Sequence, residues 1–214
     1  KIRQLKESGV SLSSLESILS GSNVSLSEEH MKYLVSWISD GVSFSKLNIK
    51  VIPKKYLSVF DKGLRLGLDM SKFIGLKHDY SVRYLELCLQ IEKMGKSCQF
   101  LLQEEFNVDV VEYLHYVSDM SDAKWKMVEE SVISKDSLER VSLLISLIKN
   151  GINVSSFQER SLSNECLSII QEAYRDKLDL SKICECSTKE EMTTLYNEMK
   201  LKKNKKVSGR IVKR

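Results

Sequence analysis

The chain has 214 residues, of which 42% are hydrophobic, and its five cysteines are too few and too irregularly spaced for a disulfide framework. Its formal net charge of +4 is unevenly divided: residues 200–214 hold eight basic and no acidic side chains, which leaves 25 basic and 29 acidic residues and a charge of −4 elsewhere. The longest strongly apolar stretch, residues 141–148, is too short to cross a bilayer, and no signal peptide is visible. We therefore expect a reduced, cytoplasmic protein without membrane spans.

The scarcity of helix-breaking residues predicts an all-α chain. Pro53 is the single proline, and no run alternates between apolar and polar residues as a strand would. In chain order, helices are expected over 1–8 and 14–19 and then from near Ser27, Pro53, Asp79, Asn107, Asp136, Ser163 and Ser187. Asp136 with Glu139, and Ser187 with Glu190, have the spacing of capping boxes. The last helix is expected to end near Lys200.

One seven-residue motif recurs along the chain. Its clearest copy is Gly-Leu-Asp-Met-Ser-Lys-Phe at residues 67–73, and copies begin at positions 9, 41, 67, 95, 119, 151 and 177. Glycine in the first column suits the left-handed residue just past a helix end. The third column is always Ser, Asp or Asn, whose side chains accept hydrogen bonds from the first amides of a following helix. The seventh column is always apolar, so the motif predicts a turn between a longer and a shorter helix.

The segment before each turn has the apolar stripe of an amphipathic helix. Before Gly151 the stripe consists of Val141, Leu144, Ile145 and Ile148. The stripe of the fifth copy is one residue out of step with Asp119, which predicts a shifted turn there. Because such units cannot bury their apolar faces alone, we expect an α-solenoid of about seven helix–turn–short-helix repeats over residues 1–200. A basic, disordered tail is expected at 201–214, and an ordinary helical bundle with glycine caps is the alternative fold.

Three of the turns resemble a short repeat of proteins from Firmicutes mobile elements and phages, in which a Gly-Leu-Asp-Val-Ser turn follows each helix. The turns are Gly-Leu-Asp-Met-Ser at 67–71, Gly-Ile-Asn-Val-Ser at 151–155 and Lys-Leu-Asp-Leu-Ser at 177–181. The resemblance covers most of residues 1–186 and departs from the pattern at Lys96, Asp119 and Asp122. It implies a stacked helical fold and a mobile-element setting, and it brings no catalytic residues.

No catalytic, cofactor or metal signature stands out in the sequence. Three histidines lie in different repeats without a partner at metal-ligand spacing: His30, His78 and His115. Of these, His30 is expected at the surface. Cys184 and Cys186 are the only close pair of thiols, and the chain offers no matching pair to complete a zinc site. Phosphate-binding glycine loops, nucleophile elbows and zinc-protease motifs are missing, and Trp37 and Trp125 fall on apolar stripes typical of a core.

The basic tail is the one candidate binding segment. It can contact phosphates, but it has no aromatic residue on which a base would stack. The candidate nucleic-acid-binding residues are Lys202, Lys203, Lys205, Lys206, Arg210, Lys213 and Arg214. A solubilising tail or a linker explains the same composition equally well.

Three functions remain open from the sequence. The first is a non-enzymatic protein-interaction solenoid, which in a mobile-element setting would be an adaptor or inhibitor acting on a nucleic-acid enzyme. The alternative is a nucleic-acid-binding helical-repeat protein that uses the tail, although the acidic body argues against binding in a groove. The third is an enzyme of the helical-repeat DNA glycosylase type, for which Asp122 beside Trp125 would be the nearest carboxylate–aromatic pair. No small-molecule substrate and no membrane partner are expected.

Overall fold

The computed structural model describes residues 26–44, 47–155, 157 and 160–211. Every regular element within these ranges is a helix and none is a strand, which confirms the predicted all-α class. The first copy of the motif, at residues 9–15, and the helices expected over 1–8 and 14–19 lie outside the described residues.

Contacts divide the chain into two compact units, Lys1–Ser118 and Asp119–Arg214. Residues 1–200 were expected to form one domain, with residues 201–214 as a separate tail. The boundary expected at residue 200 falls inside the last helix of the second unit, α13, which spans Lys189–Ile211. The two units are therefore described one at a time.

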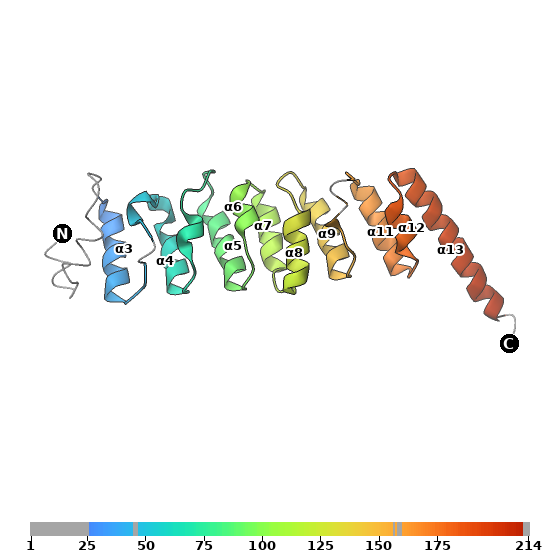
Figure 1. Ribbon diagram of the computed structural model, residues 1–214, viewed down its shortest axis with the longest axis horizontal. Coiled ribbons are helices and arrows are strands. Elements are labelled where there is room, and N and C mark those ends of the chain that lie inside the picture. Colours follow the sequence, from blue (N-terminus) through green and yellow to red (C-terminus); the bar gives the residue numbers. More distant parts are fainter. Residues whose placement is uncertain (1–25, 45–46, 156, 158–159, 212–214) are drawn as a thin grey trace. The chain divides into compact units, whose positions relative to one another are not determined.

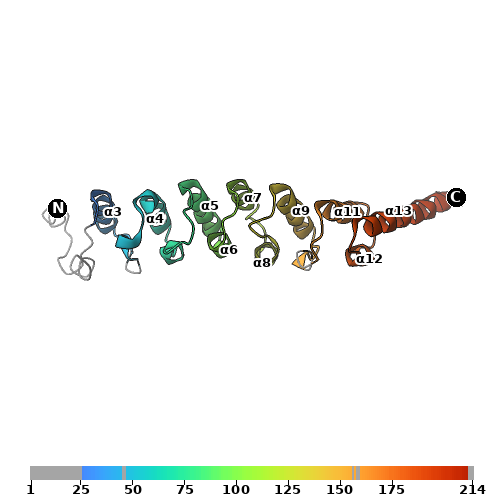
Figure 2. The ribbon, with the colours of Figure 1, turned by 90° about the horizontal axis from the view of Figure 1, so that it is seen from above.

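The first unit places its long helices side by side in chain order (Figures 1 and 2), and α3 contacts α4, α4 contacts α5, and α5 contacts α7. Its elements are α3 (Glu28–Ser39), η1 (Ile49–Val51), η2 (Lys54–Tyr56), α4 (Leu57–Arg65), η3 (Met70–Phe73), α5 (Val82–Lys93), α6 (Gln99–Gln103) and α7 (Val108–Tyr116), where η marks a 3₁₀ helix. The buried side chains come from the apolar stripes, among them Leu34, Trp37, Phe60, Leu85, Cys88 and Leu114. Neighbouring helices thus share one continuous core.

The second unit follows the same scheme. Its elements are α8 (Asp122–Ser131), α9 (Leu138–Lys149), α11 (Asn164–Arg175), α12 (Leu180–Glu185) and α13. Contacts again join neighbours in the sequence, from α8 to α9, from α9 to α11, and from α11 to α12 and α13. The predicted stripe before Gly151 is fully buried in α9.

The glycine turns have the geometry that the motif predicts. Gly67 has a φ of 73° and Gly151 a φ of 80°, and both follow a helix directly. The amide of Gly67 donates to the carbonyl of Leu64 (2.9 Å), and the next amide donates to the carbonyl of Gly63 (3.0 Å). This pair of bonds is a Schellman motif, and the same pair occurs at Gly41, Gly95, Gly151 and Lys177.

The polar third column begins the shorter helix as expected. The carboxylate of Asp69 accepts from the amide of Ser71, and that of Asp179 accepts from the amide of Ser181, both at 3.0 Å. Asn153 and Ser97 make the equivalent bonds to Ser155 and Gln99. The apolar columns then turn inward, because the side chains of Met70, Phe73, Val154 and Phe157 are almost completely buried.

Two copies depart from the pattern in different ways. Lys177 lacks the conformational freedom of glycine but still adopts a positive φ of 53°. A residue with a side chain therefore occupies the left-handed position in this copy. In the fifth copy α7 ends at Tyr116, and Asp119 is not among the left-handed residues of the described chain. The one-residue shift of its stripe therefore replaces the Schellman turn by another connection.

Three features near the helix ends differ from the predictions. Ser137, not Asp136, caps α9, with its hydroxyl accepting from the amide of Arg140 (3.2 Å). The last capping box is likewise one residue later, between Thr188 and Glu191. Both sequences offer two adjacent caps, and the inward apolar stripe decides between them. The tail also differs: α13 continues to Ile211, because leucine and lysines, which favour helices, follow Lys200 and no glycine or proline interrupts the segment before Gly209.

Candidate interaction surface

Consecutive segments of the first unit are joined by side chains that bind the backbone of the next connection. The hydroxyl of Tyr56 donates to the carbonyl of Tyr80 (2.7 Å), and the hydroxyl of Tyr80 donates to the carbonyl of Glu104 (3.3 Å). Each of these contacts spans 24 residues. Burial raises the pKa of Tyr80 to about 12, so the phenol remains a donor at neutral pH.

His30 makes the equivalent contact at the start of the described chain. Its Nε2 donates to the carbonyl of Ile52 (2.8 Å), and its Nδ1 lies 2.6 Å from the hydroxyl of Ser27. Because a carbonyl can only accept, Nε2 carries the proton and Nδ1 accepts from Ser27 in the neutral ring. The prediction that His30 lies at the surface is therefore wrong, because the residue is buried. Both of its ring nitrogens have partners within the protein, so burial leaves neither of them without a hydrogen bond.

In the second unit, arginines and not tyrosines donate hydrogen bonds to the backbone of the next segment. Nη1 of Arg140 donates to the carbonyl of Leu162 (2.6 Å), and the guanidinium of Arg160 donates to the carbonyls of Cys184 and Cys186. Arg140 also pairs with the buried carboxylate of Asp136 (3.0 Å). The residue first expected to cap α9 thus holds an arginine that reaches the next segment.

Ion pairs on the exposed surface also connect one segment to the next along the chain. Arg65 of α4 binds Asp40 after α3 (2.8 Å), and Lys200 of α13 binds Asp176 after α11 (2.9 Å). Further pairs are Lys55–Asp79, Lys62–Glu86, Lys72–Glu92 and Arg83–Glu112. Hydrogen bonds from the cations hold the pKa values of Asp40, Asp79 and Asp176 below their usual range. Each exposed pair adds little stability alone, but together they neutralise much of the helical surface.

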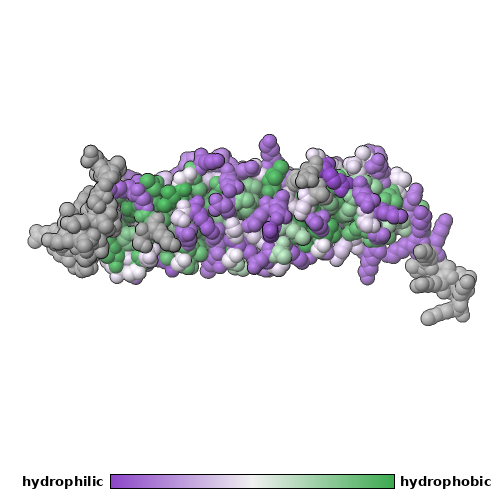
Figure 3. All heavy atoms as spheres, viewed as in Figure 1, coloured by the Kyte–Doolittle hydropathy of each residue, from purple (hydrophilic) through white to green (hydrophobic). Residues whose placement is uncertain are grey.

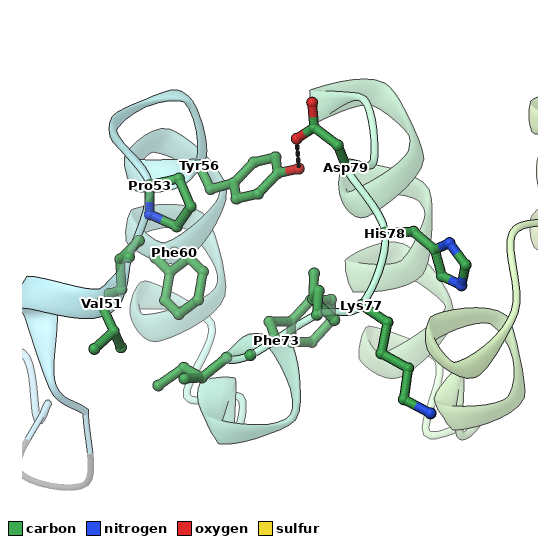
Figure 4. Close-up of a pocket in the computed structure, with 12 residues that line it drawn as sticks. Val51, Pro53, Tyr56, Phe60, Phe73, Lys77, His78 and Asp79 are labelled. Carbon is green, nitrogen blue, oxygen red and sulfur yellow. Dashed lines mark hydrogen bonds between the residues drawn. The ribbon is translucent and has the colours of Figure 1, made fainter.

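An open groove of about 320 Å³ lies between two consecutive segments of the first unit. Its aromatic floor consists of Tyr56, the last residue of η2, Phe60 of α4 and Phe73 of η3, whose rings are almost completely buried (Figure 4). Val51 and Pro53 form one wall, and the loop 74–79 forms the other. Figure 4 also shows the hydroxyl of Tyr56 directed at the carboxylate of Asp79, at 3.2 Å.

The groove has a mixed lining of apolar and polar residues, and the chain segments on either side of it carry several charges. Lys77 and His78 extend from the loop away from the aromatic floor (Figure 4). The two wall segments, residues 48–56 and 74–79, hold four lysines and one aspartate, and that aspartate, Asp79, is bound by Lys55 and Tyr56. In the space-filling view, hydrophobic residues gather toward the α3 and α4 end of this unit (Figure 3).

This groove could not be expected from the sequence. Residues 48–52 precede the helix predicted from near Pro53, and in the structure they include η1, in which Val51 is 51% exposed. A run of apolar residues and lysines between two helices, without any acidic residue, was the available signal. Its meaning depends on the facing loop 74–79, which lies one segment further along the chain.

The predicted tail residues do not form a separate cluster in the described part of the chain. Lys202, Lys203 and Lys205 are exposed on α13. Lys202 lies 3.8 Å from Glu198, and Lys203 donates to the carbonyl of Asp176. Lys206 and Arg210 belong to the helix by their backbone, whereas Lys213 and Arg214 lie outside the described residues.

The other residues singled out in the sequence are distributed over both units. Trp37 and Trp125 are buried, as predicted for core residues, and Asp122 is exposed beside the buried Trp125. His78 lies 3.9 Å from Glu105. All five cysteines are free thiols, and the described residues contain no group of three or more His, Cys, Asp or Glu side chains able to hold a metal ion.

Comparisons with known proteins add no relative. No family model matches the chain, and neither a curated protein nor a solved structure is significantly similar to it. Within the described ranges, no helix is both long and apolar enough to cross a bilayer.

Proposed function

We propose that this chain is a non-enzymatic α-solenoid that binds another protein, with about seven helix–turn–short-helix repeats. The observation that carries the proposal is the regular contact between consecutive segments. Tyr56, Tyr80 and Arg160 each bind a carbonyl about one segment further along the chain, and five turns share one hydrogen-bond pattern. Repeats that contact only their neighbours build the extended surfaces with which solenoid proteins bind their partners.

The setting of this binding rests on the turn motif. Its resemblance to repeats of Firmicutes mobile-element and phage proteins supports a cytoplasmic adaptor or inhibitor that acts on a nucleic-acid enzyme. The partner would contact the protein's surface, without a cofactor and without chemistry on a small molecule. The groove between Val51 and Phe73, of about 320 Å³, is one hollow on the described surface where such a partner would fit.

A peptide selection on the full-length chain tests the proposal. Peptides displayed on phage would be selected on the immobilised protein, and the enriched sequences would be measured by fluorescence anisotropy. We expect saturable binding to the folded chain and none to the chain unfolded in urea. Failure to enrich any sequence, together with turnover of a nucleic acid by the purified protein, would contradict a non-enzymatic interaction protein.

Nucleic-acid binding is a second candidate, because α13 ends in lysines with no acidic residue after Glu198. If α13 binds phosphates, truncation after Lys200 should abolish binding of a fluorescent duplex or single strand. The helical circular dichroism should remain, since Met192 and Tyr196, which pack in the core, precede the cut. Binding before truncation should weaken steeply as salt rises, because phosphate contacts release counterions. Binding that survives truncation would place the site elsewhere.

A further inference from the structure

Helix α13 carries opposite charges on its two halves. Residues 189–198 hold three glutamates and one lysine, a net charge of −2, whereas residues 199–211 hold six basic residues and no acidic one, a net charge of +6. We propose that α13 is a self-association surface, on which the same helix of a second copy of this chain lies antiparallel. The inference goes beyond the proposed function and does not depend on it.

The second half of α13 extends past the helices against which its first half packs. Met192 and Tyr196 are buried, and Lys200 binds Asp176 just after α11 (2.9 Å). Beyond these contacts the helix continues past α11 and α12 (Figure 1), and residues 201–205 are all exposed. Because helices in proteins gain most of their stability from packing of one face, a partner on this half would stabilise it.

The outward side of α13 forms one stripe that contains both charges. With 3.6 residues per turn, the side opposite Met192 and Tyr196 holds six residues, here called the outer stripe: Glu191, Thr194, Glu198, Leu201, Lys202 and Lys205. All six are exposed. A shallow hollow at the acidic end of the outer stripe is lined by Glu190, Glu191, Thr194, Leu195 and Glu198.

Antiparallel pairing brings the acidic half of each outer stripe opposite the basic half of the other. The arrangement is two-fold, so the same attraction acts twice, whereas parallel pairing would oppose like charges. Leu201 lies next to the midpoint of the helix, where the two-fold axis would pass. It is 62% exposed, the most of any leucine, isoleucine, valine or methionine in the described part of the chain. The two copies of Leu201 would meet at the centre and bury apolar surface there.

Neither the helix alone nor a nucleic acid explains both halves of the outer stripe. Acidic residues at the start of a helix and basic residues at its end stabilise it, but only within the first and last turns. Glu198 and Lys202 lie outside those turns, and their own contact, at 3.8 Å on the surface, contributes little. A nucleic acid would use the lysines and be repelled by the glutamates. A second copy uses the lysines, the glutamates and Leu201 together.

Sedimentation equilibrium of the full-length protein tests the proposal. We expect a mass that rises reversibly with concentration from that of one chain to that of two and no further. Rising salt should weaken the association, because interactions between exposed charges are screened. A mass that stays that of one chain at low salt up to about 1 mM protein, or that grows beyond two chains, would overturn the proposal.

Charge reversal in two double variants separates pairing from a loss of the helix. One variant carries Glu191→Lys with Glu198→Lys, and the other carries Lys202→Glu with Lys205→Glu. Each alone should self-associate at least about tenfold more weakly than the parent, because both halves of its outer stripe then have the same sign. An equimolar mixture of the two should form a mixed dimer, since the two stripes are now opposite in charge. A mixture that stays monomeric while each variant keeps its helical circular dichroism contradicts the charge pairing.

Leu201→Asp tests the centre of the pair. It should weaken self-association at least about tenfold, because it places two carboxylates where apolar surface would be buried. Leu138→Asp makes the same change at another exposed leucine of the second unit and should leave the association unchanged. Equal association of Leu201→Asp and the parent would place the contact elsewhere and overturn the proposal. A rise in mass that occurs only when a DNA duplex is added would assign α13 to nucleic acid and overturn it as well.

Discussion

Single residues in the left-handed conformation follow α3, α4, α5, α9 and α11 directly after their ends. Gly67 and Gly151 have positive φ, and a Cβ added at either glycine would meet no atom within 4 Å. A side chain there would therefore suffer from backbone strain alone. Lys177 shows that the turn tolerates such strain, since it adopts a φ of 53° in the same hydrogen-bond pattern.

Gly67→Val and Gly151→Val should each lower the free energy of unfolding by about 1–2 kcal/mol, because a β-branched residue is strained in the left-handed region. Asp119→Val should cost less, since that turn is not left-handed. Lys177→Gly should stabilise by up to about 1 kcal/mol, the relief of strain being partly offset by the greater entropy of glycine in the unfolded chain. Urea melts of the four variants test this, and parent-like melts of both glycine variants would mean that the turns have been wrongly aligned.

Exposed aspartates near the helix ends should make the free energy of unfolding depend on pH in the acidic range. The pKa values of Asp40, Asp79 and Asp176 are lowered by hydrogen bonds from Arg65, Lys55 and Lys200. A depressed folded-state pKa stabilises above the unfolded value near 4, and this contribution is lost as pH falls through the lower, folded value. The urea concentration at the unfolding midpoint should thus decrease when the pH is lowered below about 4. Asp176→Asn should flatten part of that fall, and an unchanged slope would show that its ion pair is irrelevant.

At the scale of elements, the aromatic residues of the motif connect each short helix to the core. Phe73 ends η3 with 3% of its surface exposed, and Phe157 has 1% exposed. Phe73→Ala and Phe157→Ala should each destabilise by roughly 3–5 kcal/mol, because a large cavity is left behind. Thermal and urea melts measure this loss. Tyr116→Ala, which removes an aromatic ring that is 80% exposed, is the control and should be close to neutral.

The hydroxyl of Tyr56 should matter separately from its ring. Tyr56→Phe keeps the ring against Phe60 and the groove floor and leaves the buried carbonyl of Tyr80 without this donor. The expected cost is about 1–3 kcal/mol. Tyr116→Phe removes a hydroxyl from an exposed ring and is the matched control. Equal midpoints in urea for the two variants would show that the contact to the next segment contributes nothing measurable.

Local signals explain which elements could be predicted. A left-handed turn needs glycine, and an N-cap needs a short polar side chain, so the turns at Gly41, Gly67 and Gly151 could be recognised from the sequence alone. The burial of His30 could not, because its partner Ile52 lies on the next segment. The groove has the same origin: Val51 and Leu76 become neighbours of one cavity only when two segments pack. Ser137, not Asp136, caps α9, and Asp136 instead pairs with Arg140, which reaches the next segment.

At the scale of the whole molecule, the proposed solenoid predicts a modular chain. Within each described unit, helices contact the next long helix along the sequence. In such a chain, stability is close to a sum of the stability of each repeat and of each interface. Removal of one complete repeat should then cost stability without destroying the fold, whereas an ordinary bundle would lose its shared core.

Deletion of residues 67–94 tests this directly, because it joins Leu66 to Gly95, the next glycine in the same column. The intact α4 would continue into the Gly95 turn and α6, and α4 would face α7 where α5 had been. We expect a folded chain with the same helical signal per residue and a single, lower thermal transition. Deletion of residues 67–80 removes half of that length and joins Leu66 to Ser81, the cap of α5, so that no turn follows α4; this control should lose its cooperative transition. If the full-repeat deletion behaves like the half-repeat control, the segments are not interchangeable, and the first unit is a bundle with a single indivisible core.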